Sequence, residues 1–220
     1  MRRFIRNQSL SIVLFLVFFL FLGGQSVVGY LHENDELKDH GQAPVSYTAY
    51  LGSSHFLEAT MENWESEFLQ MFAYVVLTAF LFQKGSLESK DPDKTEEVDR
   101  DPRQAKNRRN VPWPVKKGGW ILTLYEYSLS LVFLLLFLMS FWLHGVGGAS
   151  QYNKEQQEHG QPPVSVLEFM GTSQFWFQSL QNWQSEFLAV GSMVVFSVFL
   201  RQRWSAESKP VDAPHNETGE

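Results

Sequence analysis

The sequence predicts an all-α, polytopic integral membrane protein with four transmembrane helices from two tandem, parallel two-helix repeats. Three observations predict this fold class: two long runs without charge, an internal duplication at a fixed offset, and an uneven distribution of Lys and Arg. The average composition hides these features, because a net charge of −6 and 19% charged residues are ordinary for a soluble chain of 220 residues. The absence of Cys excludes disulfides, thiolate metal sites and cysteine nucleophiles.

The first and third spans are predicted from residues 7–31 and 127–153, which contain no charged side chain. Each run exceeds the roughly 20 residues that a helix needs to cross about 30 Å of hydrocarbon. Two weaker apolar runs follow, at 68–83 and 187–200, and are predicted as the second and fourth spans. The first run also has the basic start and small-residue end of a signal peptide. The duplication argues against cleavage there, because the matching segment in mid-chain must be retained.

The duplication has a constant offset of 119 residues and needs no gap. HGQAPVS at 40–46 matches HGQPPVS at 159–165, and ENWESEFL at 62–69 matches QNWQSEFL at 181–188. We call residues 119 apart counterparts. Agreement over most of each half predicts a tandem duplication. The predicted organisation is a first two-helix membrane repeat (1–90), a charged cytoplasmic linker (91–118), a second membrane repeat (119–209) and a disordered cytoplasmic tail (210–220). The linker is expected to be solvated and disordered as well.

The topology follows from the basic residues. Sixteen of the 18 Lys and Arg residues lie before the first span, in the linker or after the fourth span, and only Lys38 and Lys154 lie in the other two loops. The positive-inside rule therefore predicts that both termini and the linker are cytoplasmic, with both repeats in the same orientation. The lipid bilayer is then the principal partner. The acidic overall charge argues against binding of nucleic acid.

The predicted site is a symmetric pair of carboxylates at the outer ends of the second and fourth spans. Fourteen residues lie between Glu186 and Arg201, a helical length of about 21 Å, which would place Glu186 inside the outer edge of the hydrocarbon. Burial beside its counterpart, Glu67, would favour the protonated form of one carboxyl and create a proton-binding or cation-binding site. Four polar residues would supply hydrogen bonds, namely Asn63, Asn182, Ser66 and Ser185. The alternative is that all six residues are hydrated interfacial groups that orient and join the helices.

Several loop residues are candidates for smaller roles. His40 and His159 are counterparts and form a weak candidate for a metal site, although neither has a second ligand at short spacing, so an ordered loop contact is favoured. Ser165 and Glu168 have the spacing of a capping box, which predicts a short helix there. Ser54 and Ser173 are the predicted N-caps of the helices that carry the second and fourth spans.

The paired helices are predicted from the small residues. Leu, Phe and Val surround the first and third spans, which therefore face lipid. The second and fourth spans contain Ala, Gly, Ser and Thr, which favour close contact between helices in lipid, so these two form the inner pair.

The HGQxPVS and NWxSEFL motifs, with the charged ESK that ends each repeat, resemble those of a family of small bacterial inner-membrane proteins of unknown function. The resemblance covers nearly the whole chain and implies a multi-pass protein of the bacterial cytoplasmic membrane. It brings no reaction, substrate, cofactor or catalytic residue. The sequence also lacks HExxH, GxSxG, P-loop and GxGxxG motifs.

The function predicted from the sequence is therefore a non-enzymatic envelope or assembly protein without a cofactor, which associates with itself or with other membrane proteins. The alternative is a small proton- or cation-coupled carrier or channel that uses Glu67 and Glu186.

Overall fold

The computed structural model describes residues 2–219, of which about 70% are helical and none forms a strand. Residues 1 and 220, the outermost positions of the predicted first repeat and tail, lie outside the described residues. The chain divides into two units that are described separately. The first unit contains the chain up to Thr60 together with Leu143–Met170. The second unit contains Met61–Trp142 and the chain from Gly171 onward.

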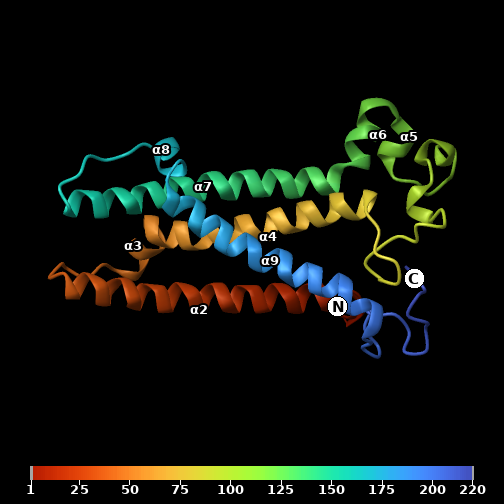
Figure 1. Ribbon diagram of the computed structural model, residues 1–220. Helices are drawn as coiled ribbons and strands as arrows, with labels where there is room; N and C mark the ends of the chain where they lie inside the picture. Colours follow the sequence, from red (N-terminus) through yellow and green to blue (C-terminus); the bar gives the residue numbers. More distant parts are fainter. Residues whose placement is uncertain (1, 220) are drawn as a thin grey trace. The chain divides into compact units, whose positions relative to one another are not determined.

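The first unit is organised around α2 (Ser9–Asp39), which follows the short α1 (Arg2–Asn7). It also holds α3 (Tyr47–Leu51), the start of α4 (Ser54–Phe80), the end of α7 (Ser128–Glu158) and α8 (Val166–Met170). The helix α2 runs eight residues beyond the predicted apolar run, and its Leu, Phe and Val side chains are largely exposed along the apolar part. Figure 1 shows how the chain turns back after α2 so that α3 lies beside it.

Two asparagines fix the loops that follow α2 and α7. Asn34 donates to the carbonyl oxygen of Val45 at 3.3 Å and accepts from its N–H at 2.8 Å. Its counterpart, Asn153, makes the same two bonds to Val164, at 2.8 and 2.7 Å. Each side-chain amide thus satisfies both backbone polar groups of one residue, as a neighbouring strand would, and holds the extended loop against its helix.

Glycines allow each short helix to lie close to its long neighbour. A Cβ added at Gly29 of α2 would lie 2.1 Å from Oη of Tyr50, and one at Gly148 of α7 would lie 2.4 Å from Cε1 of Phe169. Gly29 and Gly148 are counterparts, as are Tyr50 and Phe169. Both rings are buried, so the glycines leave the space that the rings fill.

The caps of the long helices differ by one residue from the prediction. Ser53 accepts from the N–H of Phe56 at 3.2 Å, and Thr172 accepts from that of Phe175 at 3.3 Å. Ser54 and Ser173 are instead the first helical residues of α4 and α9 (Ser173–Phe199). The side-chain hydroxyl of a residue with an extended backbone reaches an N–H of the first helical turn. Where two hydroxyl residues are adjacent, the sequence pattern does not specify which of them is the N-cap. The predicted capping box of Ser165 and Glu168 is present before α8.

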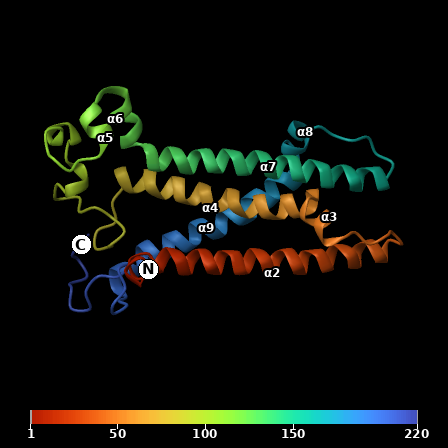
Figure 2. The ribbon, with the colours of Figure 1, turned by 180° about the vertical axis from the view of Figure 1, so that it is seen from behind.

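The second unit contains the rest of α4, the linker, the first half of α7, and α9 with the tail. The linker carries two 3₁₀ turns (Glu97–Asp99 and Pro102–Ala105) and α5 (Trp113–Lys117), and α6 (Gly119–Glu126) leads into α7. In Figure 2, α5 and α6 follow each other closely. The packing of α7 on α9 is aromatic, since Phe141 lies 5.2 Å from Phe175 and 6.3 Å from Trp183 between ring centroids.

The tail follows α9 and lies along the turn after α4. Lys209 is 2% exposed, and its ammonium donates to four carbonyl oxygens, those of Gly85 (2.6 Å), Glu217 (2.8 Å), Pro214 (3.2 Å) and His215 (3.3 Å). Thr218 accepts from the N–H of Gly85 at 2.7 Å. One lysine therefore gathers the C-terminal segment around a single charge, in a part of the chain where the sequence predicts disorder.

Within residues 2–219, two helices are long and apolar enough to cross a membrane by length and composition, α2 and α7. They are the first and third of the four predicted spans. Of the predicted fold class, the structure therefore establishes an all-helical protein with two helices of membrane-spanning length.

Candidate functional site

The six predicted site residues lie on α4 and α9 within the second unit. The carboxylate of Glu67 interacts electrostatically with that of Glu186. Glu67 is exposed and Glu186 is half-buried. Gln70 donates to the backbone carbonyl of Glu186 at 3.5 Å, which ties α4 to α9 at this level. The two predicted acids are therefore neighbours, although only one of them is withdrawn from solvent.

The predicted hydroxyl and amide ligands have partners of their own. Ser66 and Ser185 each donate to a carbonyl oxygen of their own helix at 2.8 Å, those of Asn63 and Asn182 respectively. The side-chain amide of Asn182 donates at 2.6 Å to Glu62, an acid outside the predicted set. The two serines thus bond within their helices, and Asn182 joins the helices through Glu62.

Glu65 is the most deeply buried of the described acids in the second unit. Like Glu62, it is not among the site residues predicted from the sequence. Its residue exposure is 0%, and Trp183 donates its indole Nε1–H to Oε1 at 3.2 Å. Glu62 and Glu65 lie three residues apart and so share one face of α4, while Asn182 and Trp183 are adjacent on α9. Figures 1 and 2 show α9 crossing α4 obliquely in both views. Two acid-to-donor bonds therefore join this pair of helices.

A difference between the two copies could have revealed these acids. Glu58, Glu62 and Glu65 follow one another along α4 at spacings of four and three. Their counterparts on α9 are all uncharged, namely Phe177, Gln181 and Gln184. The sequence interpretation relied on residues shared by the copies and so selected Glu67 with Glu186. Acids found in one copy only indicate a role that the second copy does not share.

The first unit contains a separate polar cluster beside α3. Glu33 and His55 are in direct contact, and Glu33 is buried. The ring of Tyr50 lies 6.0 Å from that of His55 between centroids. Burial, followed by the charge of Glu33 and by Tyr47, raises the pKa of Tyr50, so its phenol stays protonated. The counterparts of Glu33 and His55 are Tyr152 and Gln174, so this pair is also particular to the first copy.

The paired histidines of the loops are bound locally. Nδ1 of His40 lies 2.8 Å from the carbonyl oxygen of Glu36, and Nδ1 of His159 lies 2.8 Å from that of Glu155. Each imidazole thus contacts the last turn of its own helix. No group of three or more His, Asp or Glu side chains suited to a metal ion occurs among residues 2–219.

Comparison with known proteins gives one match. A family model described as "Domain of unknown function (DUF6766)" matches residues 1–220. No curated protein and no solved structure matches the chain. The match confirms the predicted membership of an uncharacterised family and assigns no residue a role.

Proposed function

Because the chain belongs to this family of unknown function, we propose its role from its own residues. We propose that it is a multi-pass protein of a bacterial cytoplasmic membrane, with α2, α4, α7 and α9 as spans and both termini cytoplasmic. The length and apolarity of α2 and α7 support membrane insertion. The concentration of Lys and Arg in the linker and at both ends supports the orientation.

We propose further that the spans form two tandem repeats. Hydrogen bonds that recur at counterpart positions support this architecture. Ser89 accepts from the N–H of Gln83 at 2.8 Å, and Ser208 accepts from that of Gln202 at 2.8 Å. The asparagine bonds at Val45 and Val164 recur in the same way.

The proposed activity is reversible binding of a proton or a small cation by the carboxylates of α4. The observation that carries it is the complete burial of Glu65 on a helix that continues to Phe80, about 22 Å further along its axis. With a hydrocarbon core of about 30 Å, Glu65 lies within the outer third of the membrane. Ionisable groups at such depth are costly and mark proton or ion pathways by default. Glu62 and the pair Glu67 and Glu186 would supply further carboxylates nearby.

A structural role is the second candidate, and the bonds across α4 and α9 favour it. Interhelical hydrogen bonds in lipid stabilise helix pairs by about 1 kcal/mol. Glu62 with Asn182 and Glu65 with Trp183 would then hold the inner pair of helices together in a non-enzymatic envelope or assembly protein. Self-association or binding to other membrane proteins would follow through the exposed faces.

Reconstitution of the full chain into vesicles separates the two candidates. Proton and monovalent-cation flux is measured for the natural protein, Glu65→Gln and Glu97→Gln, the last being an equal change at an exposed linker acid. Flux that is lost in Glu65→Gln and retained in Glu97→Gln supports ion binding. Absence of flux in the natural protein, with a lower unfolding temperature for Glu65→Gln, would reject ion transfer and favour the structural role.

A further inference from the structure

The turns that follow α4 and α9 have the same backbone and different residues at their tightest point. Gly85 has φ of +89°, and its counterpart, Trp204, has φ of +70°. Both turns carry the same backbone-to-serine bonds: Ser86 accepts from the N–H of Glu88 and Ser205 from the N–H of Glu207, each at 3.1 Å. A left-handed turn is therefore built into both copies, with glycine in one and tryptophan in the other.

Tryptophan is a poor choice for this conformation. A bulky side chain at positive φ is a genuine outlier, because its Cβ approaches the backbone too closely. Among the described residues other than glycine, Trp204 is the one with positive φ. Packing does not account for it, because Trp204 is 90% exposed. Strain that the fold does not require points to a function of the side chain.

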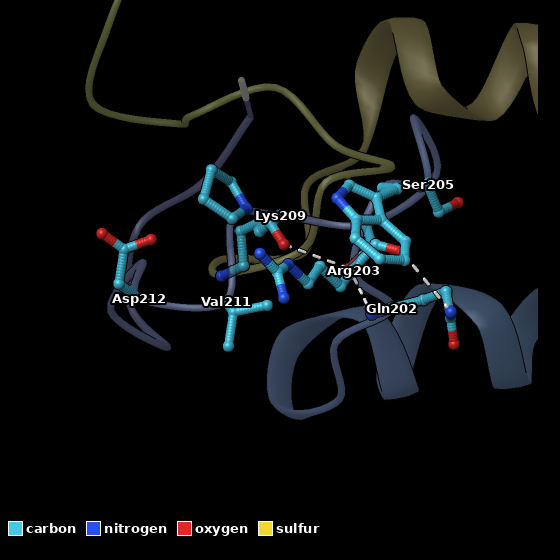
Figure 3. Close-up of a pocket in the computed structure, with 9 residues that line it drawn as sticks. Gln202, Arg203, Ser205, Lys209, Val211 and Asp212 are labelled. Atoms are coloured by element: carbon cyan, nitrogen blue, oxygen red, sulfur yellow. Dashed lines mark hydrogen bonds between the residues drawn. The ribbon is translucent and has the colours of Figure 1, made fainter.

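The neighbouring groups form a small basic pocket. The guanidinium carbon of Arg203 lies 4.7 Å from the centroid of the Trp204 ring, which holds the charge beside the indole. A pocket of about 340 Å³ adjoins them, lined also by Ser205, Ser208 and Lys209. Figure 3 shows Arg203 between Lys209 and Ser205, with Asp212 at the far end. The guanidinium of Arg203 and the hydroxyl of Ser205 are suitable donors for a phosphate group. The ammonium of Lys209 is bound to carbonyl oxygens and contributes positive charge nearby.

The pocket lies directly after the apolar end of α9. Phe196, Phe199 and Leu200 are exposed there, as side chains in contact with lipid would be. An indole stacked with a guanidinium at the end of such a helix has the chemistry of the membrane interface, where both groups are favoured. The cytoplasmic leaflet is rich in anionic lipid, which attracts Lys and Arg near its surface.

We propose that Arg203, Trp204 and the Ser205 hydroxyl of the adjoining pocket bind the phosphate of an anionic phospholipid headgroup in the inner leaflet. The guanidinium of Arg203 pairs with the phosphate, and Trp204 extends into the headgroup layer beside it. The proposal rests on the membrane placement proposed above and not on the carboxylates of α4. It also accounts for the strain, because a turn with glycine would leave the guanidinium without its aromatic support.

The test uses the purified full chain in a neutral detergent and three soluble probes: short-chain phosphatidylglycerol, short-chain phosphatidylcholine and inorganic phosphate. Calorimetry measures binding to the natural protein, Arg203→Gln, Trp204→Gly and Lys84→Gln. Lys84 is the counterpart of Arg203 and serves as the matched control. Loss of one charge-assisted bond should weaken phosphatidylglycerol binding about tenfold in Arg203→Gln. We expect a similar loss in Trp204→Gly and no change in Lys84→Gln.

Thermal unfolding of the same variants shows whether the Trp204 side chain strains the backbone of the turn or stabilises the turn by packing. Trp204→Gly should unfold at a higher temperature, by about 2–4 °C, because glycine relieves the strain while lipid binding falls. A lower unfolding temperature with unchanged binding would overturn the proposal. Equal affinity for phosphatidylcholine and phosphatidylglycerol would also overturn the proposal. If inorganic phosphate binds as tightly as phosphatidylglycerol, the pocket is a site for free phosphate instead.

Carbonate extraction of membranes distinguishes this failure from that of the membrane placement. A chain that stays in the membrane pellet and has no preference for phosphatidylglycerol overturns the headgroup site alone. A chain that is released into the wash overturns the membrane placement and the headgroup site together.

Discussion

Asn34 and Asn153 lie 119 residues apart, and each binds both the N–H and the carbonyl oxygen of a valine eleven residues further along. Replacing either asparagine by Ala leaves the N–H and the carbonyl oxygen of that valine without these two partners. Each change should lower the free energy of unfolding by about 1–3 kcal/mol. Asn107→Ala, at an exposed linker position, is the control and should have little effect. Unfolding temperatures in detergent provide the measurement, and equal values for all three variants would contradict the assigned role.

The second prediction concerns Gly147, where α7 lies close to the backbone of α4. A Cβ there would lie 2.8 Å from the backbone nitrogen of Glu58, which a side-chain rotation cannot relieve. Gly147→Ala should therefore destabilise the protein by about 1–3 kcal/mol. Gly191→Ala is the matched control, because no atom lies within 4 Å of the added carbon. That change should leave stability unchanged or raise it, since Ala is the better helix former. Similar losses in both variants would show that helix flexibility, rather than close approach, requires these glycines.

The capping box of α8 predicts a dependence on pH. Glu168 accepts from the N–H of Ser165 at 2.7 Å, and this bond, followed by that of the Ser165 hydroxyl, lowers the pKa of its carboxyl. The folded-state pKa thus lies below the unfolded value of 4.5. The stabilisation is therefore present above pH 4.5 and is lost as the pH falls through the folded-state pKa.

The first copy has Ala49 where the second has Glu168, which permits the reverse experiment. Ala49→Glu should create a second capping box with Ser46, which already accepts from the N–H of Ala49 at 3.3 Å. We expect a higher unfolding temperature at pH 7 and a gain that shrinks as the pH falls below 4.5. Ser165→Ala should cost about 1 kcal/mol as the loss of an N-cap. A gain from Ala49→Glu that is unchanged as the pH falls would mean that helix propensity, and not the ionised carboxylate, is responsible.

The helices and the counterpart residues could be predicted from the sequence, but the acid that meets α9 could not. The helices followed from uninterrupted apolar runs, and the counterpart residues followed from an offset that needs no gap. The choice between Glu62, Glu65 and Glu67 did not follow, because three acids within six residues surround most of a helix. Successive residues turn by about 100°, so Glu62 and Glu65 share a face while Glu67 points away from it. Which face meets α9 depends on the register of Trp183 and Asn182, and one helix alone does not specify that register.

The tail provides the last prediction. The sequence predicts disorder for residues 210–220, since the segment is polar and short of apolar residues, whereas the structure places Lys209 among four carbonyl oxygens drawn largely from it. Lys209→Met removes the charged donor that these four oxygens share. Hydrogen exchange in residues 210–219 should then become at least about tenfold faster, because hydrogen bonds to a charged group stabilise by about 1.5–3 kcal/mol.

The control for this prediction is the counterpart lysine. Lys90 pairs with Asp99 at 2.8 Å and is more accessible, so Lys90→Met should leave exchange in the tail unchanged. Exchange in the natural protein as fast as in an unfolded peptide would instead establish the disorder that the composition predicts. The burial of the Lys209 ammonium favours the ordered outcome. If the tail were released, Lys209 would keep the carbonyl oxygen of Gly85 as its remaining partner among the four. Burial of an ammonium without enough acceptors costs several kcal/mol, so release of the tail is unfavourable.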